Sequence, residues 1–303
     1  MNKKTLFKNF LNFFWLRPEN ALIFSLKAEK LNLCKKHFKG NSIDISCGNG
    51  IFTFLTYGGE ISKKNDMYQS LNYTNKDIYD NYKKYKINVT KYPKKKFTFG
   101  TDWKNNLLKK SKKLNFYKNL ILHDNNLKLP FKDNHFDFMY NSSSYWVKKF
   151  EYHINEMLRV LKPKGRLILT MKTKNIIKFN LKSLTNKNFD KKFYKILDGN
   201  RLSSYKGLKN MDEYIKIIEK NKKIKILKIE PIYCRKVNLI WDVGLRPIIK
   251  PLAILANSAK IHDRIKAKNL MIKIFLKLFD SFIKNYKPEK KFAVEWFVEI
   301  TKI

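Results

Sequence analysis

Cysteine is scarce in this chain, and its scarcity excludes two kinds of small-domain architecture. The 303 residues contain three cysteines, Cys34, Cys47 and Cys234, and no Cys-x-x-Cys pair. An odd number of widely spaced cysteines argues against both a disulfide framework and a structural zinc site. We therefore expect a protein of a reducing compartment, the cytoplasm, with no bound metal.

Long uninterrupted apolar runs are also missing. The run Pro251–Ala259 is closed by Lys250 and Lys260, so it falls short of the ~20 apolar residues that span a bilayer. The N-terminal segment 1–16 resembles a signal peptide at first, but lysines and asparagines interrupt its apolar residues. It is typical of an amphipathic helix instead.

Arginine and acidic residues are few, whereas lysine is abundant. Only 7 of the 65 basic residues are arginine, against 25 acidic residues, and the formal net charge is +40. Arginine supplies the planar fork that recognises phosphates and guanine edges, whereas lysine tolerates almost any solvated surface. The lysines are also dispersed along the chain. We therefore favour a solvated lysine-rich surface, while attraction to RNA or to an acidic membrane stays open as an alternative.

The most informative pattern is the segment Ser42–Phe54, in which a short apolar run is followed by two glycines and an amphipathic stretch. This order predicts a strand, a tight turn and the start of a helix. Glycine at 48 and 50 allows close approach of the backbone to a ligand, and the free N–H groups of the following helix form a polar cradle. A nucleotide-like ligand is expected at this turn.

Apolar periodicity predicts strands and helices in alternation along most of the chain. Strands are expected at 42–46, 97–102, 119–124, 135–140, 166–171, 224–232 and 292–300. Helices are expected at 4–16 and 19–38, after the glycine turn, around 107–114 and 154–161, and at 212–221. This alternation predicts an α/β fold, a Rossmann-like, doubly wound and mainly parallel seven-stranded sheet with helices on both faces.

Polar residues stand at the carboxyl ends of three predicted strands. These residues are Asp102, Asp124 and Asn141, and in an open α/β sheet such strand ends meet at one ligand-binding edge. An acid after the second strand can accept hydrogen bonds from ribose hydroxyls, and one after the third can accept from an adenine amino group. Trp103 could lie against the purine. Either aspartate taken singly could also be a helix N-cap.

Taken together, several motifs resemble the class I S-adenosylmethionine-dependent methyltransferases, including their type 11-like and quinone-biosynthesis members. The motifs are Asp44-Ile-Ser-Cys-Gly-Asn-Gly50, Gly100-Thr-Asp102, His123-Asp124, Leu129-Pro-Phe131, Asn134-His-Phe-Asp137 and Arg159–Thr170. The resemblance implies S-adenosylmethionine as the cofactor. It places the methionine portion at Asp44, Ser46, Cys47, Gly48 and Gly50, the ribose at Asp102, and the adenine at Asp124 and Asn125, with Trp103 and Asn141 on the same edge.

Two features depart from that family. Ser46 stands where glycine is usual, and Asp102 lies 52 residues beyond Gly50, much later than the ribose-binding acid usually does. An insertion at 60–95 accounts for the second departure. Asp66 stands at the ordinary spacing but follows no apolar strand, so we favour Asp102. A dinucleotide oxidoreductase would need glycine where the chain has Thr53, which counts against that alternative.

The acceptor side is less clearly marked. Tyr145 and Trp146 follow the fourth strand and are candidates for the acceptor pocket, with ordinary lid or core aromatics as the alternative. The catalytic residue stays unassigned, because no histidine is a convincing general base. Methyl transfer requires such a base only when the nucleophile arrives protonated.

We expect the extra segments to form a cap that selects the acceptor. The predicted organisation is an N-terminal helical cap at 1–40, an S-adenosylmethionine-binding domain at 41–234 with the insertion 60–95, a helical insertion at 235–289, and a final strand within 290–303. A helix at 268–286 is expected to pack on the domain or a second subunit, with peripheral membrane contact as the alternative.

The favoured function is methyl transfer to a small-molecule or lipid-linked acceptor. An RNA methyltransferase and a non-catalytic S-adenosylmethionine-binding partner protein remain the alternatives. Nucleic-acid contact is not favoured, because the sequence contains no separate RNA-binding module.

Overall fold

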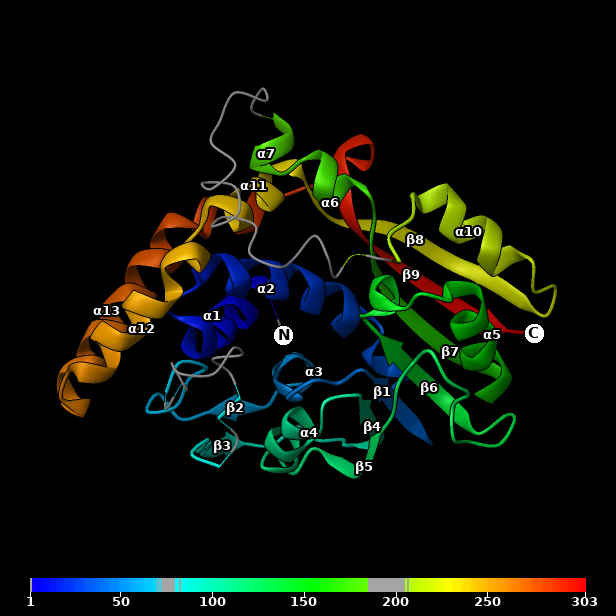
Figure 1. Cartoon of the computed structure of the whole chain (residues 1–303), viewed down its shortest axis with the longest axis horizontal. Coiled ribbons are helices and arrows are strands. Elements are labelled where there is room, and N and C mark those ends of the chain that lie inside the picture. The colour runs from blue at the N-terminus through cyan, green and yellow to red at the C-terminus, as the bar shows by residue number, and fades with distance from the viewer. Residues whose placement is uncertain (1, 70, 72–79, 82, 185–204, 206) are drawn as a thin grey trace.

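A twisted sheet of seven strands forms the centre of the computed structural model, which describes residues 2–69, 71, 80, 81, 83–184, 205 and 207–303 (Figure 1). The strand order is β5-β4-β1-β6-β7-β9-β8, and β9 alone runs antiparallel to its neighbours β7 and β8. The predicted mainly parallel sheet is confirmed. The strands are β1 Ser42–Ile45, β4 Phe97–Asp102, β5 Tyr117–Leu122, β6 Phe136–Asn141, β7 Leu161–Lys172, β8 Ile224–Cys234 and β9 Ala293–Lys302.

Helices cover both faces of the sheet, because the side chains of each strand alternate between two apolar cores. Phe138 and Tyr140 of β6 belong to the core beneath α1, α2 and α3, whereas Met139 belongs to the core beneath α5 and α10. The α-helices are α1 Lys3–Phe14, α2 Pro18–Leu33, α3 Ile51–Thr56, α4 Asn105–Lys112, α5 Phe150–Val160, α6 Asn175–Lys178, α7 Leu181–Leu184, α10 Met211–Glu219, α11 Arg235–Val243, α12 Ile249–Ser258, α13 Ile261–Leu278 and α14 Asp280–Asn285. Short 3-10 turns lie at η1 Lys35–His37, η2 Ser144–Trp146, η3 Arg246–Ile248 and η4 Lys290–Phe292.

Several predicted elements differ from those observed. The expected helix 268–286 is two helices, because the chain leaves helical geometry at Phe279 and α14 starts afresh at Asp280. No strand was predicted within the insertion 60–95, yet it contains the antiparallel pair β2 Glu60–Ile61 and β3 Val89–Lys91. Strand β5 begins at Tyr117, two residues before the predicted start, because its pairing with β4 opens at Phe97.

A buried cluster of charged side chains joins the insertion 60–95 to α13. The carboxylate of Asp66 forms an ion pair with the guanidinium of Arg264, with N–O distances of 2.8 and 2.9 Å, and the Asp66 side chain is fully buried. The ammonium of Lys268 lies 3.7 Å from the same carboxylate and donates to the carbonyls of Lys63 and Asn65. Asp66, the rival candidate for the ribose-binding acid, is therefore engaged within the protein.

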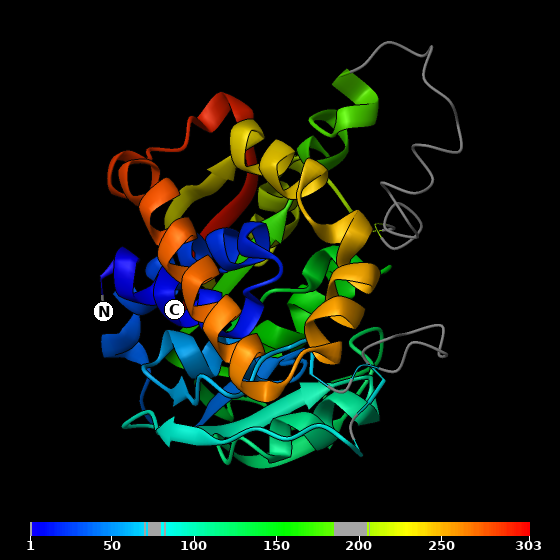
Figure 2. The ribbon, with the colours of Figure 1, turned by 90° about the vertical axis from the view of Figure 1, so that its left-hand side faces the viewer.

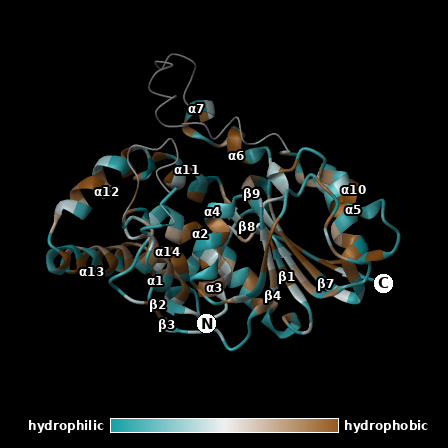
Figure 3. Cartoon of the chain, turned by 60° about the horizontal axis from the view of Figure 1, so that its bottom comes forward, coloured by the Kyte–Doolittle hydropathy of each residue, from teal (hydrophilic) through white to brown (hydrophobic). Residues whose placement is uncertain are grey.

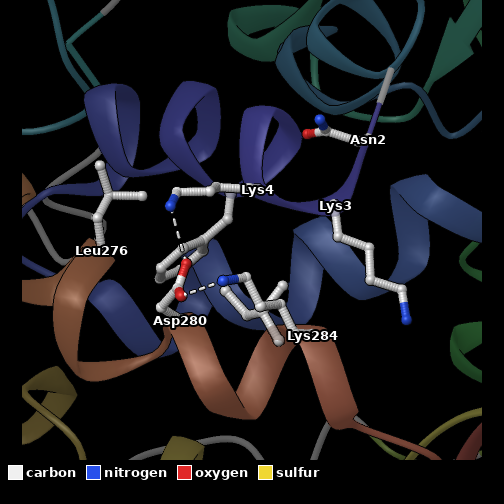
Figure 4. Close-up of a pocket in the computed structure, with 8 residues that line it drawn as sticks. Asn2, Lys3, Lys4, Leu276, Asp280 and Lys284 are labelled. Atoms are coloured by element: carbon white, nitrogen blue, oxygen red, sulfur yellow. Dashed lines mark ion pairs between the residues drawn. The ribbon is translucent and has the colours of Figure 1, made fainter.

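A second junction joins α14 to α1 (Figure 4). The carboxylate of Asp280 lies between two ammonium groups, 2.9 Å from Lys4 and 2.7 Å from Lys284. Beneath this bridge, Phe7 meets the ring of Phe279 edge-on at a centroid distance of 5.7 Å. The bend at Phe279 thus lets the last helical turns pack against α1 while α13 continues along the insertion.

Candidate functional site

The glycine turn lies between the carboxyl ends of two neighbouring strands. Ile45, the last residue of β1, is paired with Thr101 on β4 and with Asn141 on β6. Because these strands are parallel, Asp102, the turn that follows Ile45, and Asn141 meet at one edge of the sheet. Three of the predicted site segments are therefore brought together, although they are far apart in the sequence.

The turn itself requires left-handed backbone at three positions. Ser46, Gly48 and Gly50 have φ of 59°, 59° and 75°. A Cβ on Gly50 would lie 2.7 Å from Ser111 Oγ, so a side chain does not fit there, whereas a Cβ on Gly48 would meet nothing within 4 Å. Gly48 therefore faces open space, as a backbone that receives a ligand must.

Ser46 occupies a conformation in which glycine carries no steric penalty. Its hydroxyl accepts a hydrogen bond from Asn125 Nδ2 at 2.6 Å, which ties the turn to the segment after β5. A buried hydrogen bond contributes about 1 kcal/mol, and the left-handed conformation of a non-glycine residue costs about the same. The two effects explain how serine is tolerated at this position.

Substitutions at Ser46 separate these two contributions. We expect Ser46→Ala to lower the free energy of unfolding by about 1 kcal/mol, because the hydrogen bond is lost and the strain stays. Ser46→Gly loses the same hydrogen bond but is relieved of the strain, so it is expected to be about 1 kcal/mol more stable than Ser46→Ala. Urea unfolding curves measure both variants, and a Ser46→Gly protein less stable than Ser46→Ala contradicts this explanation.

Asp102 holds the turn from the side of β4. Its Oδ2 accepts from the Gly48 N–H at 3.0 Å and its Oδ1 from the Lys104 N–H at 2.9 Å. Burial raises its pKa above the ordinary aspartate value, and the two backbone N–H groups oppose that rise. Since two carboxylate oxygens offer about four acceptor positions, this side chain retains the capacity to accept from two hydroxyl groups.

Asp44 supports the turn from below rather than lining its open side. It is buried, and its Oδ2 accepts from the hydroxyls of Thr53 and Tyr117, each at 2.7 Å. Desolvation raises the pKa of Asp44 to about 7. Gly100 makes room for the Tyr117 ring, which a Cβ would approach to 2.7 Å. Thr53 thus has a structural role, as a hydrogen-bond donor to Asp44, at the position where a dinucleotide-binding motif has glycine.

Cys47 continues this support at the centre of the turn. Its backbone N–H donates to the carbonyl of Thr101 at 2.8 Å, and its thiol is buried. Burial raises the pKa of the thiol further above its ordinary value, so the group is uncharged. The backbone of Cys47, rather than its sulfur, fixes the turn to β4.

The segment after β5 contains one polar side chain that accepts hydrogen bonds and one whose acceptor oxygen has no partner among the described residues. Asp124 is exposed and accepts from the backbone and side-chain nitrogens of Asn126, which lowers its pKa. Asn125 is buried, and its Oδ1 has no hydrogen-bond partner among the described residues. Trp103 is 67% exposed, with the ammonium of Lys104 5.4 Å from its ring centre. An unpaired buried acceptor and an exposed aromatic face fit an adenine ring with its amino group.

Asn141 organises the loop that leads to the predicted acceptor residues. Its side chain is fully buried, and its Oδ1 accepts from the Ser144 hydroxyl at 2.7 Å. Its amide also contacts His153 Nε2 at 3.3 Å, and burial lowers the pKa of that histidine to about 4. The loop then presents Tyr145, which is buried, and Trp146, which is 51% exposed. His153 is neutral and enclosed in this network.

A row of polar side chains at the end of β7 was not predicted. Lys172 on β7 is paired in register with Glu295 on β9, which is paired in turn with Tyr233 on β8. The ammonium of Lys172 lies 5.2 Å from the ring centres of Tyr145 and Trp241. Extending the alternation of the predicted strand 166–171 by one residue would have placed Lys172 on the face of Ile168 and Thr170.

The same row contains buried groups with unmet hydrogen bonds. Lys27 of α2 forms an ion pair with Glu295, whose carboxylate is fully buried. The second carboxylate oxygen of Glu295 and the hydroxyl of Tyr233 have no hydrogen-bond partner within the described part of the chain. Lys172, Glu295 and Tyr233 therefore form a polar cluster beside Tyr145, beneath α2 and α11.

A comparison with protein families finds a similarity that overlaps part of this site. Residues 86–169 match a family model described as a methyltransferase domain. The matched stretch contains Asp102, Asp124, Asn141 and Tyr145, and it begins after the glycine turn and most of the insertion. No curated protein matches the chain in sequence.

Solved structures with a similar course of the chain include several methyltransferases. Geranyl diphosphate C-methyltransferase from Streptomyces coelicolor, solved with S-adenosylhomocysteine, is 9% identical, with a TM-score of 0.47 over 94% of this chain and 83% of the other. A methyltransferase from Thermotoga maritima is 11% identical, with a TM-score of 0.45 over 93% and 92% of the two chains. The cyclase SpnF is 13% identical, with a TM-score of 0.47 over 92% and 81%.

The similarity concerns residues 86–169, which include β4, β5, β6 and most of β7. The match does not extend to the quinone-biosynthesis group, so that finer assignment remains a prediction. The strand order, the glycine turn and the matched residues on β4 to β7 belong to one structural unit. Over residues 86–169 the chain is thus similar to a methyltransferase domain, and these residues lie on a Rossmann-like, mainly parallel seven-stranded sheet.

Proposed function

We propose that the chain transfers a methyl group from S-adenosylmethionine to a small-molecule or lipid-linked acceptor that enters beside Tyr145 and Trp146. The observation that carries this proposal is the set of unsatisfied acceptors beside the open glycine turn. Asp102 keeps spare acceptor capacity, and Asn125 Oδ1 is buried without a partner among the described residues. These groups suit the two ribose hydroxyls and the adenine amino group of the cofactor.

Each residue at this edge of the sheet then has a defined role in binding the cofactor. S-adenosylmethionine supplies, when bound, a methyl group already activated on a sulfonium sulfur. In this proposal Asp102 accepts from the ribose, Asn125 and Asp124 border the adenine, and Trp103 covers the purine face. The backbone at Gly48 borders the methionine portion, while Asp44 acts through Thr53 and Tyr117 as a positioning residue for that turn.

On the acceptor side the protein has to orient the nucleophile and exclude water. Tyr145 and Trp146 supply apolar walls, and Lys172 brings a cation close to Tyr145. We assign no general base, since His153 is neutral and enclosed with Asn141. An acceptor with a negatively charged or readily ionised group would match Lys172 and would need no base.

The cap assignment completes the proposal. The helices α1 and α2, the insertion 60–95 and the helices of 235–289 are proposed to enclose the acceptor over the sheet edge. Their mutual contacts support this reading, since Asp66 of the insertion binds Arg264 of α13, and the Arg264 guanidinium lies 5.4 Å from the ring centre of Trp15 after α1. Three segments that are distant in the sequence thereby hold one another.

Calorimetry followed by a labelling experiment tests the proposal. We expect S-adenosylmethionine and S-adenosylhomocysteine to bind and NAD not to bind. With methyl-labelled cofactor and a cell extract, label is expected in the small-molecule or lipid fraction. Label in RNA would favour the RNA methyltransferase alternative, and binding without label in any fraction would favour the non-catalytic partner protein. Failure of both cofactor forms to bind would refute the proposal.

A further inference from the structure

Exposed apolar side chains are concentrated on two helices at one end of the molecule. Of the eighteen large hydrophobic residues that are exposed in the described part of the chain, eight fall within 243–278. They are Val243, Ile248, Ile254, Leu255, Ile261, Leu270, Ile274 and Leu278. A concentration of this kind marks an interaction surface, whereas single exposed apolar residues are ordinary. Val243 lies on α11 and Ile248 in η3, whereas the other six lie on α12 and α13, and we call these six residues the α12–α13 surface.

The buried side of α13 fixes the orientation of the helix. Its exposed apolar residues are therefore not the result of a loosely packed helix. Arg264, Lys268 and Ile272, spaced four residues apart, point inward, and the first two are held by Asp66 and the insertion. Leu270, Ile274 and Leu278 repeat at the same spacing but lie on another side of the helix, and they are 59%, 46% and 67% exposed. Residues at i and i+4 share a helix face, so these three form one outward stripe.

Lysines accompany this stripe. Lys266, Lys273 and Lys277 are exposed on α13, and Lys250 and Lys260 are exposed at the two ends of α12. Asp263 is the one acidic residue in the whole segment 243–278. A helix with an exposed apolar stripe bordered by lysines has the composition of helices that lie in the interface of an anionic bilayer.

The position of the two helices suits contact with a planar surface. Figures 1 and 2 show α12 and α13 at the outer end of the molecule, away from the helices α5 and α10. Figure 3 shows apolar residues along both helices. None of the helices within the described residues is long and apolar enough to cross a membrane, so the contact would be peripheral.

From these observations we propose that the α12–α13 surface binds the surface of an anionic lipid bilayer, with its leucines and isoleucines in the interface and its lysines at the headgroups. Charge complementarity selects this occupant. A second copy of the chain would bring the same lysines of a +40 protein against one another, which is unfavourable. Nucleic acid would match the lysines but would leave the apolar stripe in water.

Vesicle flotation tests the inference, using vesicles of phosphatidylcholine alone and of phosphatidylglycerol and phosphatidylcholine in about a 3:7 ratio. The full chain is expected to float with the anionic vesicles, to float less with neutral ones, and to be released as salt rises. The variant Leu270→Glu/Leu278→Glu is expected to bind anionic vesicles at least about tenfold more weakly, because two apolar contacts are lost.

The matched control is Leu33→Glu/Leu227→Glu, which makes the same charge change at exposed leucines on other elements. It is expected to bind like the unaltered chain. Equal loss in both variants would show a general charge effect and overturn the inference. So would failure of the unaltered chain to float with anionic vesicles at low salt.

Two further measurements keep the result interpretable. Light scattering distinguishes the alternative occupant, because an unaltered dimer that Leu270→Glu/Leu278→Glu converts to a monomer would assign the surface to a second copy and overturn the inference. Circular dichroism shows whether each variant is folded, and Leu270→Ser/Leu278→Ser replaces the glutamate variant if that variant is not. Binding of S-adenosylhomocysteine is measured in parallel, so that failure at the lipid surface is distinct from failure of the proposed function.

Discussion

Asp102→Ala is expected to weaken the binding of S-adenosylhomocysteine by about 100-fold. The substitution removes the carboxylate proposed to accept from both ribose hydroxyls, and hydrogen bonds to a charged group contribute about 1.5 kcal/mol each. It also removes the acceptor for the Gly48 and Lys104 N–H groups, so the glycine turn loses its support from β4. Calorimetric titration of the variant and of the unaltered chain gives the two dissociation constants.

Two further variants serve as controls for the loss of affinity in Asp102→Ala. Asp212→Ala removes an exposed carboxylate in the first turn of α10 and is expected to leave the affinity unchanged, although it alters the net charge equally. Asp102→Asn keeps the shape but can accept fewer hydrogen bonds, so an intermediate affinity is expected. If folded Asp102→Ala binds as tightly as the unaltered chain, the assignment of Asp102 to the ribose is wrong.

The parts of this molecule that the sequence predicted are those governed by local patterns. The strand predicted at 135–140 is observed as β6, Phe136–Asn141, and its Phe138 and Met139 lie on opposite faces because side chains alternate along a strand. Gly48 and Gly50 predicted the turn because its left-handed backbone favours glycine. The preference for Asp102 over Asp66 as the ribose-binding acid stays a prediction, and the carboxylate of Asp66 is bound to Arg264.

The parts that were not predicted depend on distances across the fold. Thr53 and Tyr117 share the carboxylate of Asp44, but this contact exists only once β5 is in register with β4 and Gly100 leaves space for the ring. The polar cluster around Lys172 arises likewise, because Glu295 is paired with it from a strand more than one hundred residues away. Neither arrangement corresponds to a periodic pattern in the sequence.

Asp66→Ala is the second change for which a large effect is expected, in this case on stability. It leaves the guanidinium of Arg264 and the ammonium of Lys268 buried without their carboxylate. Breaking a buried ion pair from one side costs about 3–5 kcal/mol, since the remaining charge is uncompensated. Urea unfolding measures the loss. Asp66→Leu combined with Arg264→Met and Lys268→Met removes all three charges and is expected to recover most of it.

The pH dependence of unfolding provides an independent readout of the same cluster. Burial lowers the pKa of Lys268 to about 8 in the folded chain, although Asp66 opposes this shift. Between that value and the ordinary lysine pKa the unfolded chain binds more protons than the folded one, so this residue makes stability rise with pH across the window. We expect Lys268→Met to remove this rise.

In Asp66→Ala the pKa of Lys268 falls further, because the opposing carboxylate is gone. The deficit in stability of Asp66→Ala relative to the unaltered chain is therefore expected to shrink as the pH rises through neutral values to 8, and to level off above 8, where Lys268 is uncharged in both folded proteins. The lost ion pair with Arg264 is expected to leave part of the deficit in place at every pH. A deficit that is constant across this range, or a Lys268→Met protein that keeps the full rise, would contradict the role given to the buried cluster in joining the insertion to α13.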